Sequence, residues 1–229
     1  MELAKQHIDV GLMVNDWDLA SHFWGDVVGL EYTKFEKIGG GVRQHRYDAH
    51  GSVVKVNHSR TALAVEPTIH RRVRIADEAM YEPTLIHDPE GVEVELVPPG
   101  HDDVVGIEVV NATGDAREAE RFWVVGCGAQ EIGHRRYRLG DSIIQLVPVA
   151  SLVRPTTRSA AGFRYLTVQV HDVDREYARL LELGFVGERP PVSLGTTARI
   201  SFVRDPDGAY IEVSQRAEVT GAPIPPATS

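Results

Sequence analysis

The chain alternates between two patterns of hydrophobic residues. In residues 8–14 the apolar side chains occupy every second position, which is typical of a strand with one buried face. Residues 16–29 place their apolar side chains at helical spacing, and Asp16 provides an N-cap. The same order, a strand followed by an Asp-capped helix, recurs at 107–128 and at 165–184. The pattern predicts a repeated unit that begins with a strand and a helix.

Two similar hairpins complete the repeated unit. The stretches DPEG at 88–91 and DPDG at 205–208 suit tight turns, because Asp caps the turn, Pro presets φ and Gly closes it. Apolar and polar residues alternate in the strand after each turn, so Glu95 and Glu212 should point away from the packed face. The unit is therefore a strand, a helix and two or three further strands. Its repetition predicts an α+β fold.

The repeats also indicate how the chain is divided. Residues 98–103, PPGHDD, are the natural linker between two halves. We expect an N-terminal domain at 1–100, a C-terminal domain at 101–216 and a mobile tail at 217–229. Too few residues follow Ile75 for a full helix, so the second unit should be abbreviated.

Composition narrows the classes of partner. The net charge is −9 and no basic stripe is present, which argues against nucleic acid. No apolar run reaches the length of a membrane span, and the N-terminus carries no apolar segment typical of a signal peptide, so we expect a cytoplasmic protein without membrane contact. Cys127 is the only cysteine, which excludes an intramolecular disulfide, and its apolar neighbours predict a buried residue.

Two segments carry a resemblance to a known family. IDVGLMVNDWDLASHFWGDVVGLEY at 8–32 resembles the opening module of the vicinal oxygen chelate superfamily, and YLTVQVHDVDREYARLLELGF at 165–185 with DPDGAYIEV resembles its closing module. That superfamily includes glyoxalase I, extradiol dioxygenases and bleomycin-binding proteins. The resemblance covers about residues 7–216. It implies four βαβββ modules paired into two glyoxalase-like domains, each with a concave sheet around a cleft.

The resemblance also implies where a divalent metal would bind, because the family takes its ligands from the first and last strands of each module. Carried over position by position, the N-terminal set is Asp9, Lys55, His70 and Glu95. The C-terminal set is Glu108, Gln145, Tyr165 and Glu212. Neither set holds the two histidines and one carboxylate of an open ferrous site, which disfavours extradiol ring cleavage. The candidate metal ligands are Glu95, His70, Glu108 and Glu212, for Mg, Mn, Zn or Fe; a site without any cofactor is the alternative.

Lys55 gives the N-terminal set its own cation. An ammonium group beside Asp9 and Glu95 could supply the positive charge that a metal would otherwise bring. The surrounding hairpin, residues 39–60, is basic and rich in histidine, which indicates either an anion site or a solvated hairpin. Within it, His45 is the candidate general acid or base, because the ordinary pKa of histidine lies near neutrality.

Four further residues are candidates for substrate binding. By strand parity Asn57 should point inward with Lys55, and Arg72 could hold a carboxylate through two hydrogen bonds. The other two are Tyr165 and Gln145, on the implied concave face.

The sequence leaves two functions open. One is an isomerase or lyase that acts on a small oxygenated organic molecule, stabilises an enolate or oxyanion with a metal or with Lys55, and uses His45, Lys55 and Asp9 in catalysis. The other is a non-catalytic binding protein of the drug-sequestering type. The incomplete ligand sets favour the binding protein, and the basic hairpin favours the enzyme. The expected partner is a small-molecule ligand, with a homodimer as an open alternative.

Overall fold

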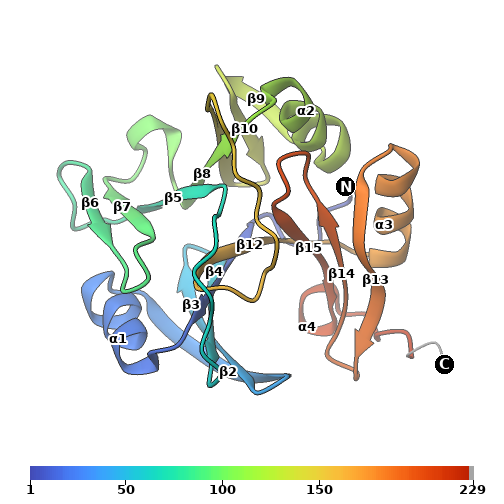
Figure 1. Ribbon diagram of the computed structural model, residues 1–229, viewed down its shortest axis with the longest axis horizontal. Coiled ribbons are helices and arrows are strands. Elements are labelled where there is room, and N and C mark those ends of the chain that lie inside the picture. The colour runs from blue at the N-terminus through green and yellow to red at the C-terminus, as the bar shows by residue number, and fades with distance from the viewer. Residues whose placement is uncertain (227–229) are drawn as a thin grey trace.

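The computed structural model describes residues 1–226, in which two curved sheets carry most of the chain (Figure 1). The eight-stranded sheet has the order β13-β14-β15-β12-β1-β4-β3-β2, and the seven-stranded sheet β6-β7-β5-β8-β11-β10-β9. The strands of the first are β1 (Asp9–Val14), β2 (Glu31–Gly39), β3 (Val42–Ala49), β4 (Ser52–Ser59), β12 (Gly162–Gln169), β13 (Val186–Leu194), β14 (Ala198–Arg204) and β15 (Tyr210–Arg216). Those of the second are β5 (His70–Ala76), β6 (Thr84–His87), β7 (Glu93–Val97), β8 (Ile107–Thr113), β9 (Gln130–Gly133), β10 (Arg136–Leu139) and β11 (Ser142–Pro148). The observed fold is the α+β, glyoxalase-like arrangement of two concave sheets that the sequence predicts.

Each sheet combines two modules from different halves of the chain. β1 of the first module pairs antiparallel with β12 of the last, and β5 of the second pairs antiparallel with β8 of the third. In Figure 1 the blue strands accordingly lie beside the orange and red ones, while the green strands belong to the other sheet. The sheets therefore do not follow the expected division into 1–100 and 101–216. Sequence repeats mark the modules, but the pairing depends on which strand edges meet in space.

The helices begin where the sequence predicts. An aspartate side chain accepts hydrogen bonds from backbone N–H groups at the start of each of three helices: Asp16, Asp115 and Asp172. These helices are α1 (Trp17–Ser21), α2 (Ala116–Arg121) and α3 (Val173–Glu182); the first two continue as the π-helical segments η1 (His22–Val27) and η3 (Phe122–Cys127). Between β5 and β6 the chain forms no helix, which confirms the abbreviated second unit. Among residues 1–226, no helix has the length and apolar character needed to cross a membrane.

Two short helices lie outside the modules: η2 (His101–Asp103) in the linker and α4 (Ala217–Thr220) after the last strand. The tail expected to be mobile is held against the eight-stranded sheet over its described part. Glu218 of α4 pairs with Arg216 at 2.9 Å, and Ser193 Oγ donates to the carbonyl of Pro225 at 2.7 Å. Residues 227–229 of that expected tail lie outside the described residues.

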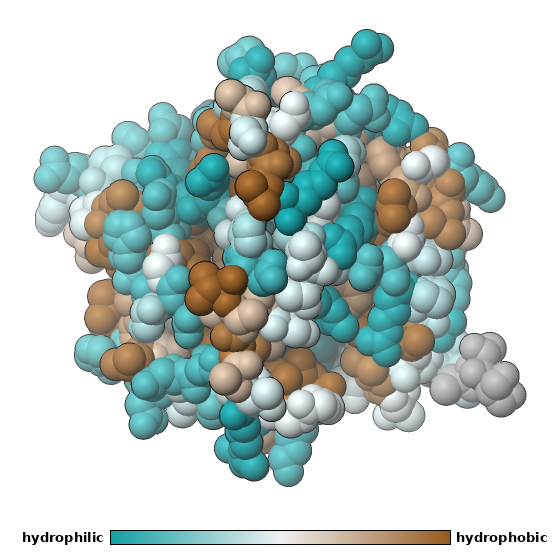
Figure 2. Space-filling model, viewed as in Figure 1, coloured by the Kyte–Doolittle hydropathy of each residue, from teal (hydrophilic) through white to brown (hydrophobic). Residues whose placement is uncertain are grey.

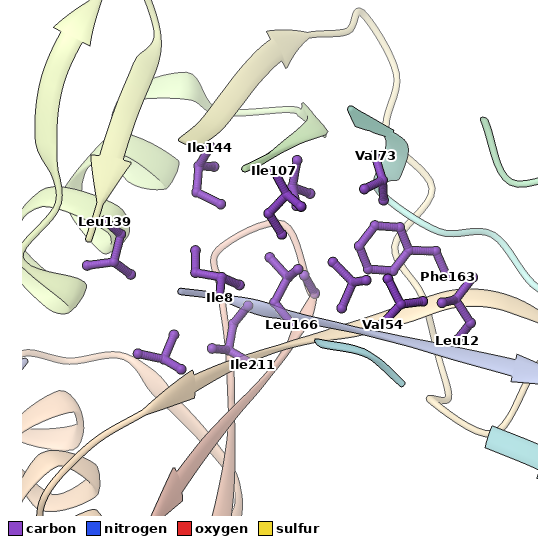
Figure 3. Packing of buried hydrophobic residues seen from close by; sticks show 14 of the residues in the cluster. Ile8, Leu12, Val54, Val73, Ile107, Leu139, Ile144, Phe163, Leu166 and Ile211 are labelled. Carbon is purple, nitrogen blue, oxygen red and sulfur yellow. The ribbon is translucent and has the colours of Figure 1, made fainter. Parts of the chain in front are cut away.

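One hydrophobic core joins the two sheets. Figure 3 shows side chains of the eight-stranded sheet, such as Leu12, Leu166 and Ile211, on one side of the core, and Val73 and Ile107 of the seven-stranded sheet on the other. Each such side chain, when fully buried, stabilises the fold by about 1.5–3 kcal/mol. The apolar faces of both sheets are thereby used for packing, and their polar faces are left to form clefts.

The outer surface itself is mixed. The view in Figure 2 shows hydrophobic side chains scattered among hydrophilic ones rather than gathered in one broad patch. Scattered exposed apolar residues are normal for a folded protein and mark no binding surface. The candidate sites are therefore the hollows on the concave faces.

Candidate functional site

The concave face of the eight-stranded sheet holds a cavity of about 690 Å³, here called the eight-stranded cleft. Its apolar walls include Met13, Ile200 and Phe202. Its charged lining is mostly cationic: Lys37, Lys55, Arg158, Arg189 and Arg216 stand against Glu36 and Glu212. This excess of positive charge, in a chain of net charge −9, favours an anionic ligand.

Lys55 lies at the floor of this cleft with 2% of its surface exposed. Its Nζ donates to Thr167 Oγ1 at 2.7 Å and to Glu212 Oε2 at 3.4 Å, and it lies 3.8 Å from Asp9 Oδ2. We call Asp9, Lys55, Thr167 and Glu212 the Lys55 centre. A buried ammonium group is tolerated only with such partners, and a buried carboxylate equally requires a cation.

The charges of the Lys55 centre depend on one another. Burial lowers the pKa of Lys55 below its ordinary value, and the carboxylates of Glu212 and Asp9 partly offset this effect. Burial by itself would raise the pKa of Asp9, but the Lys55 and Lys5 ammonium groups outweigh it and lower that pKa. Lys5 Nζ lies 2.6 Å from Asp9 Oδ1, at the edge of the buried region. Asp9 is therefore ionised inside the protein because two lysines face it.

Tyr165 lies beside this centre in the cleft. Its hydroxyl accepts hydrogen bonds from Asn57 Nδ2 at 3.1 Å and from Gln44 Nε2 at 3.4 Å. Burial raises the pKa of Tyr165, so the hydroxyl keeps its proton. The ring lies directly over Gly11, where an added Cβ would come within 2.2 Å of ring atoms. Two amides thus occupy the lone pairs of a protonated hydroxyl whose hydrogen remains available to a ligand.

The rim of the cleft carries cations that are not neutralised. The guanidinium carbon of Arg158 lies 4.2 Å from the centre of the Phe202 ring, within range of a cation–π interaction. Within residues 1–226, Arg158, Arg189 and Lys37 form no ion pair, whereas Arg216 pairs with Glu36 and Glu218. A ligand with an acidic group would find three unpaired cations at this rim.

The concave face of the seven-stranded sheet forms a second hollow of about 600 Å³, the seven-stranded cleft. Here the charged groups are already paired. Arg74 Nε lies 2.6 Å from Glu95 Oε2 and its Nη1 lies 2.5 Å from Glu108 Oε2. Arg72 pairs with Glu95, and Arg136 pairs with Glu108. This network leaves few charges free for a ligand.

The strand register gives the two clefts matching positions. In each sheet two first strands pair antiparallel at the centre, and the last strand of each module pairs parallel with its own first strand. Four positions therefore correspond to the Lys55 centre. In the seven-stranded cleft Glu108 stands where Asp9 does and Gln145 where Lys55 does. Arg74 takes the position of Thr167, and Glu95 that of Glu212. We call these four residues, Glu108, Gln145, Arg74 and Glu95, the Arg74 centre. The Lys55 centre and the Arg74 centre thus each hold two carboxylates and one cation.

The predicted grouping of these residues by halves of the chain is wrong. Lys55 and Asp9 meet Glu212, not Glu95, because the first module pairs with the last. Thr167 rather than Tyr165 is the register partner of Asp9, so Tyr165 lies one position along the same face. Lys55 does lie beside Asp9, as predicted, and Lys5 is a second cation there that was not predicted.

Two candidate histidines lie outside both clefts. His45 pairs with Val56 in the register and so shares the face opposite to Lys55 and Asn57, where its ring stacks on Trp17 at 3.5 Å. It is therefore not placed to act as an acid or base on a ligand in the cleft. Burial also lowers its pKa.

His70 is displaced by a bulge. The register of β5 shifts between His70 and Arg72, which turns His70 toward the core, where it stacks on Phe163 at 4.2 Å and contacts Asn111. Burial lowers its pKa to about 4, so it is neutral at pH 7. Its expected place in the ligand set is taken by Arg74.

The remaining candidates divide between the clefts. Asn57 and Tyr165 line the eight-stranded cleft with Lys55, and Arg72 and Gln145 line the seven-stranded one. Four further residues contribute to the eight-stranded cleft without being predicted from the sequence: Thr167, Gln44, Phe202 and Arg158. Strand parity could have found Thr167, since it shares a face with Tyr165, whereas Arg158 lies in an irregular loop that carries no periodic signal.

The donor sets do not fit a divalent metal. Lys55 and Arg74 stand among the carboxylates in positions where the family resemblance implies ligands, and ammonium and guanidinium groups have no lone pair to offer. Within residues 1–226, no three His, Cys, Asp or Glu side chains are grouped so that they could hold a metal ion.

The geometry agrees with comparisons to known proteins. The sequence model of the Glyoxalase/Bleomycin resistance protein/Dioxygenase superfamily matches residues 6–213. Among curated proteins, no sequence matches this chain. Glyoxalase I from Zea mays superposes with a TM-score of 0.71 at 14% identity, covering 92% of both chains. The cppA protein from Streptococcus pneumoniae TIGR4 gives 0.60 at 13% identity, covering 91% of this chain and 97% of that one. At these identities the likeness concerns the fold.

Proposed function

This chain belongs to the Glyoxalase/Bleomycin resistance protein/Dioxygenase superfamily, and we propose that its eight-stranded cleft binds a small organic anion and removes a proton from a carbon next to a carbonyl group. The reaction class would be that of an isomerase or lyase. The observation that carries this proposal is the Lys55 centre at the floor of a cation-rich cavity. Together with Tyr165 beside it, this centre combines a carboxylate, a protonated hydroxyl and a compensating ammonium group without needing a metal.

Glu212 is the proposed base. Its Oε2 is held by Lys55 and by Thr167 Oγ1, which donates at 3.2 Å, while its side chain lines the cavity. A carboxylate fixed at one oxygen keeps the other oxygen free to accept a proton. Lys55 and Asp9 are positioning residues in this scheme, since they fix the carboxylate and balance its charge.

Tyr165 is the proposed donor to the developing oxyanion. Its hydroxyl is oriented by Asn57 and Gln44, and burial keeps it protonated. A preorganised donor aimed at the position where charge develops is among the largest contributions to catalysis. The carbonyl oxygen of the ligand would therefore lie near Tyr165, and its acidic group near Arg158 and Arg189 at the rim.

A non-catalytic binding protein is the second candidate. It is favoured by the engagement of Lys55, whose ammonium group already contacts Thr167, Glu212 and Asp9. In that case the cleft would bind the same class of anion, and Glu212 would serve only to hold Lys55.

Exchange of a carbon-bound proton of the ligand for deuterium distinguishes the enzyme from the binding protein. The protein is incubated in D₂O with a panel of aryl- and alkyl-substituted keto acids, and NMR follows both ligand binding and loss of the C–H signal. If the protein is an enzyme, the C–H signal of the bound keto acid should be lost with the wild type. Glu212→Gln should still bind the keto acid but should no longer exchange its proton. Glu95→Gln, in the other cleft, is the matched control. Binding without exchange would identify the binding protein. No binding of any keto acid would contradict the proposal.

A further inference from the structure

The two clefts hold their carboxylates at corresponding positions, but the cation that lies between them comes from a different position in each. In the Lys55 centre the cation comes from β4, the last strand of the first module; in the Arg74 centre it comes from β5, the first strand of the second module. Each cation contacts the two carboxylates that face it across the sheet. The same charge balance is therefore reached with a cation at two different positions of the module.

We infer that Lys55 and Arg74 act as built-in replacements for a divalent ion, so that both clefts are metal-independent, and that Lys55 alone prevents metal binding in the eight-stranded cleft. Two buried carboxylates require positive charge, and either a metal or a side-chain cation can supply it. A cation fixed among them fills the space between the oxygens and repels a second cation. This inference does not depend on any reaction in the cleft.

The geometry makes position 55 the decisive one. Asp9 and Glu212 both approach the Lys55 ammonium group, at 3.8 Å and 3.4 Å, and Thr167 contributes a hydroxyl oxygen at 2.7 Å. A carboxylate or imidazole at position 55 would leave oxygen and nitrogen donors around an empty centre, a set that suits Mn²⁺ or Zn²⁺. The Arg74 centre is less open to this change, because Arg72 and Arg136 also pair with its carboxylates.

The test is metal binding by the whole chain, measured by calorimetric titration with Mn²⁺ and Zn²⁺ and by elemental analysis of protein purified without chelator. The wild type should contain less than one equivalent of any divalent metal and show no saturable site. Lys55→Glu and Lys55→His should each bind one ion, and the melting temperature of Lys55→Glu should rise on adding Mn²⁺. Lys37→Glu is the matched control, since it makes the same charge change at the exposed rim of the same cleft.

Two results would overturn the inference. One is a stoichiometric metal in the wild type that is lost in Glu212→Gln. The other is a folded Lys55→His protein that, like Lys55→Glu, binds Mn²⁺ and Zn²⁺ no more tightly than Lys37→Glu does. The histidine variant is included because three adjacent carboxylates in Lys55→Glu could prevent folding in the metal-free state.

Discussion

The two clefts share a fold and a register, yet they differ in how their charges are used. In the eight-stranded cleft a lysine that is 2% exposed holds two carboxylates, while three rim cations have no ion-pair partner among the described residues, 1–226. In the seven-stranded cleft Arg74 sits in a continuous network with Arg72, Arg136 and their acidic partners. The first arrangement leaves charge for a ligand, and the second uses its charge for structure. Modules of the same kind thus form one candidate site and one structural ion network.

The largest expected difference between the clefts concerns stability. Lys55→Met leaves Asp9 and Glu212 buried without their shared cation, and removal of one partner from a buried ion pair typically costs about 3–5 kcal/mol. Gln145→Met changes the matching position in the other cleft, where no charge is lost, and should cost less than about 1 kcal/mol. Urea unfolding of both variants measures the two values. Equal effects would mean that Lys55 does not balance the carboxylates.

The effect of Lys55→Met should depend on pH. In the wild type the pKa of Asp9 lies below its ordinary value, so its contribution to stability is present above pH 3.8 and is lost as the pH falls through the folded-state pKa. Without Lys55, the largest contribution that lowers this pKa is lost, although Lys5 still faces Asp9, so the pKa should rise above its wild-type value and Asp9 should contribute less stability as the pH rises. The stability gap between wild type and Lys55→Met should therefore widen from pH 4 to pH 7. A constant gap across this range would contradict the assigned pairing.

A smaller difference concerns the centre of each sheet. The register places Gly11 opposite Tyr165 in the eight-stranded cleft and Val110 opposite Arg72 in the other. Gly11→Ala would force the Tyr165 ring to move, because the new Cβ would lie 2.2 Å from it, and such overpacking costs about 1–3 kcal/mol. The shift of the Tyr165 ring should also weaken the binding of an organic anion in the eight-stranded cleft. Val110→Ala, the control, should leave binding unchanged.

The smallest effect on stability is expected at the rim. Arg158→Ala removes a cation that pairs with no carboxylate in the part of the chain that the structure describes, so the free energy of unfolding should change by less than about 0.5 kcal/mol. Affinity for 8-anilinonaphthalene-1-sulfonate, an aromatic anion with a fluorescent readout, should fall about tenfold, which corresponds to about 1.4 kcal/mol. Arg72→Ala in the seven-stranded cleft should leave the affinity for this probe unchanged. Similar affinities for all three proteins would show that the rim cations do not select the ligand.

The sequence by itself determined the local features. The helices start at the caps Asp16, Asp115 and Asp172, because each of these side chains accepts a hydrogen bond from a backbone N–H only a few residues away. Alternation with a period of two places Lys55 and Glu212 on the concave faces, because successive side chains of a strand point to opposite sides. The number of residues after Ile75 is likewise a local feature, and it is too small for a full helix in the second unit.

Only the tertiary structure decided which concave residues meet. The pairing of β1 with β12 brings Lys55 to Glu212 instead of Glu95, and this pairing links strands that are more than 100 residues apart in the chain. A bulge in β5 turns His70 into the core, although regular alternation would have kept it in the cleft. Parity is a local property of each strand, whereas the meeting of strand edges and the position of a bulge depend on how all four modules pack around one shared core. The charge centres of both clefts are therefore products of that packing.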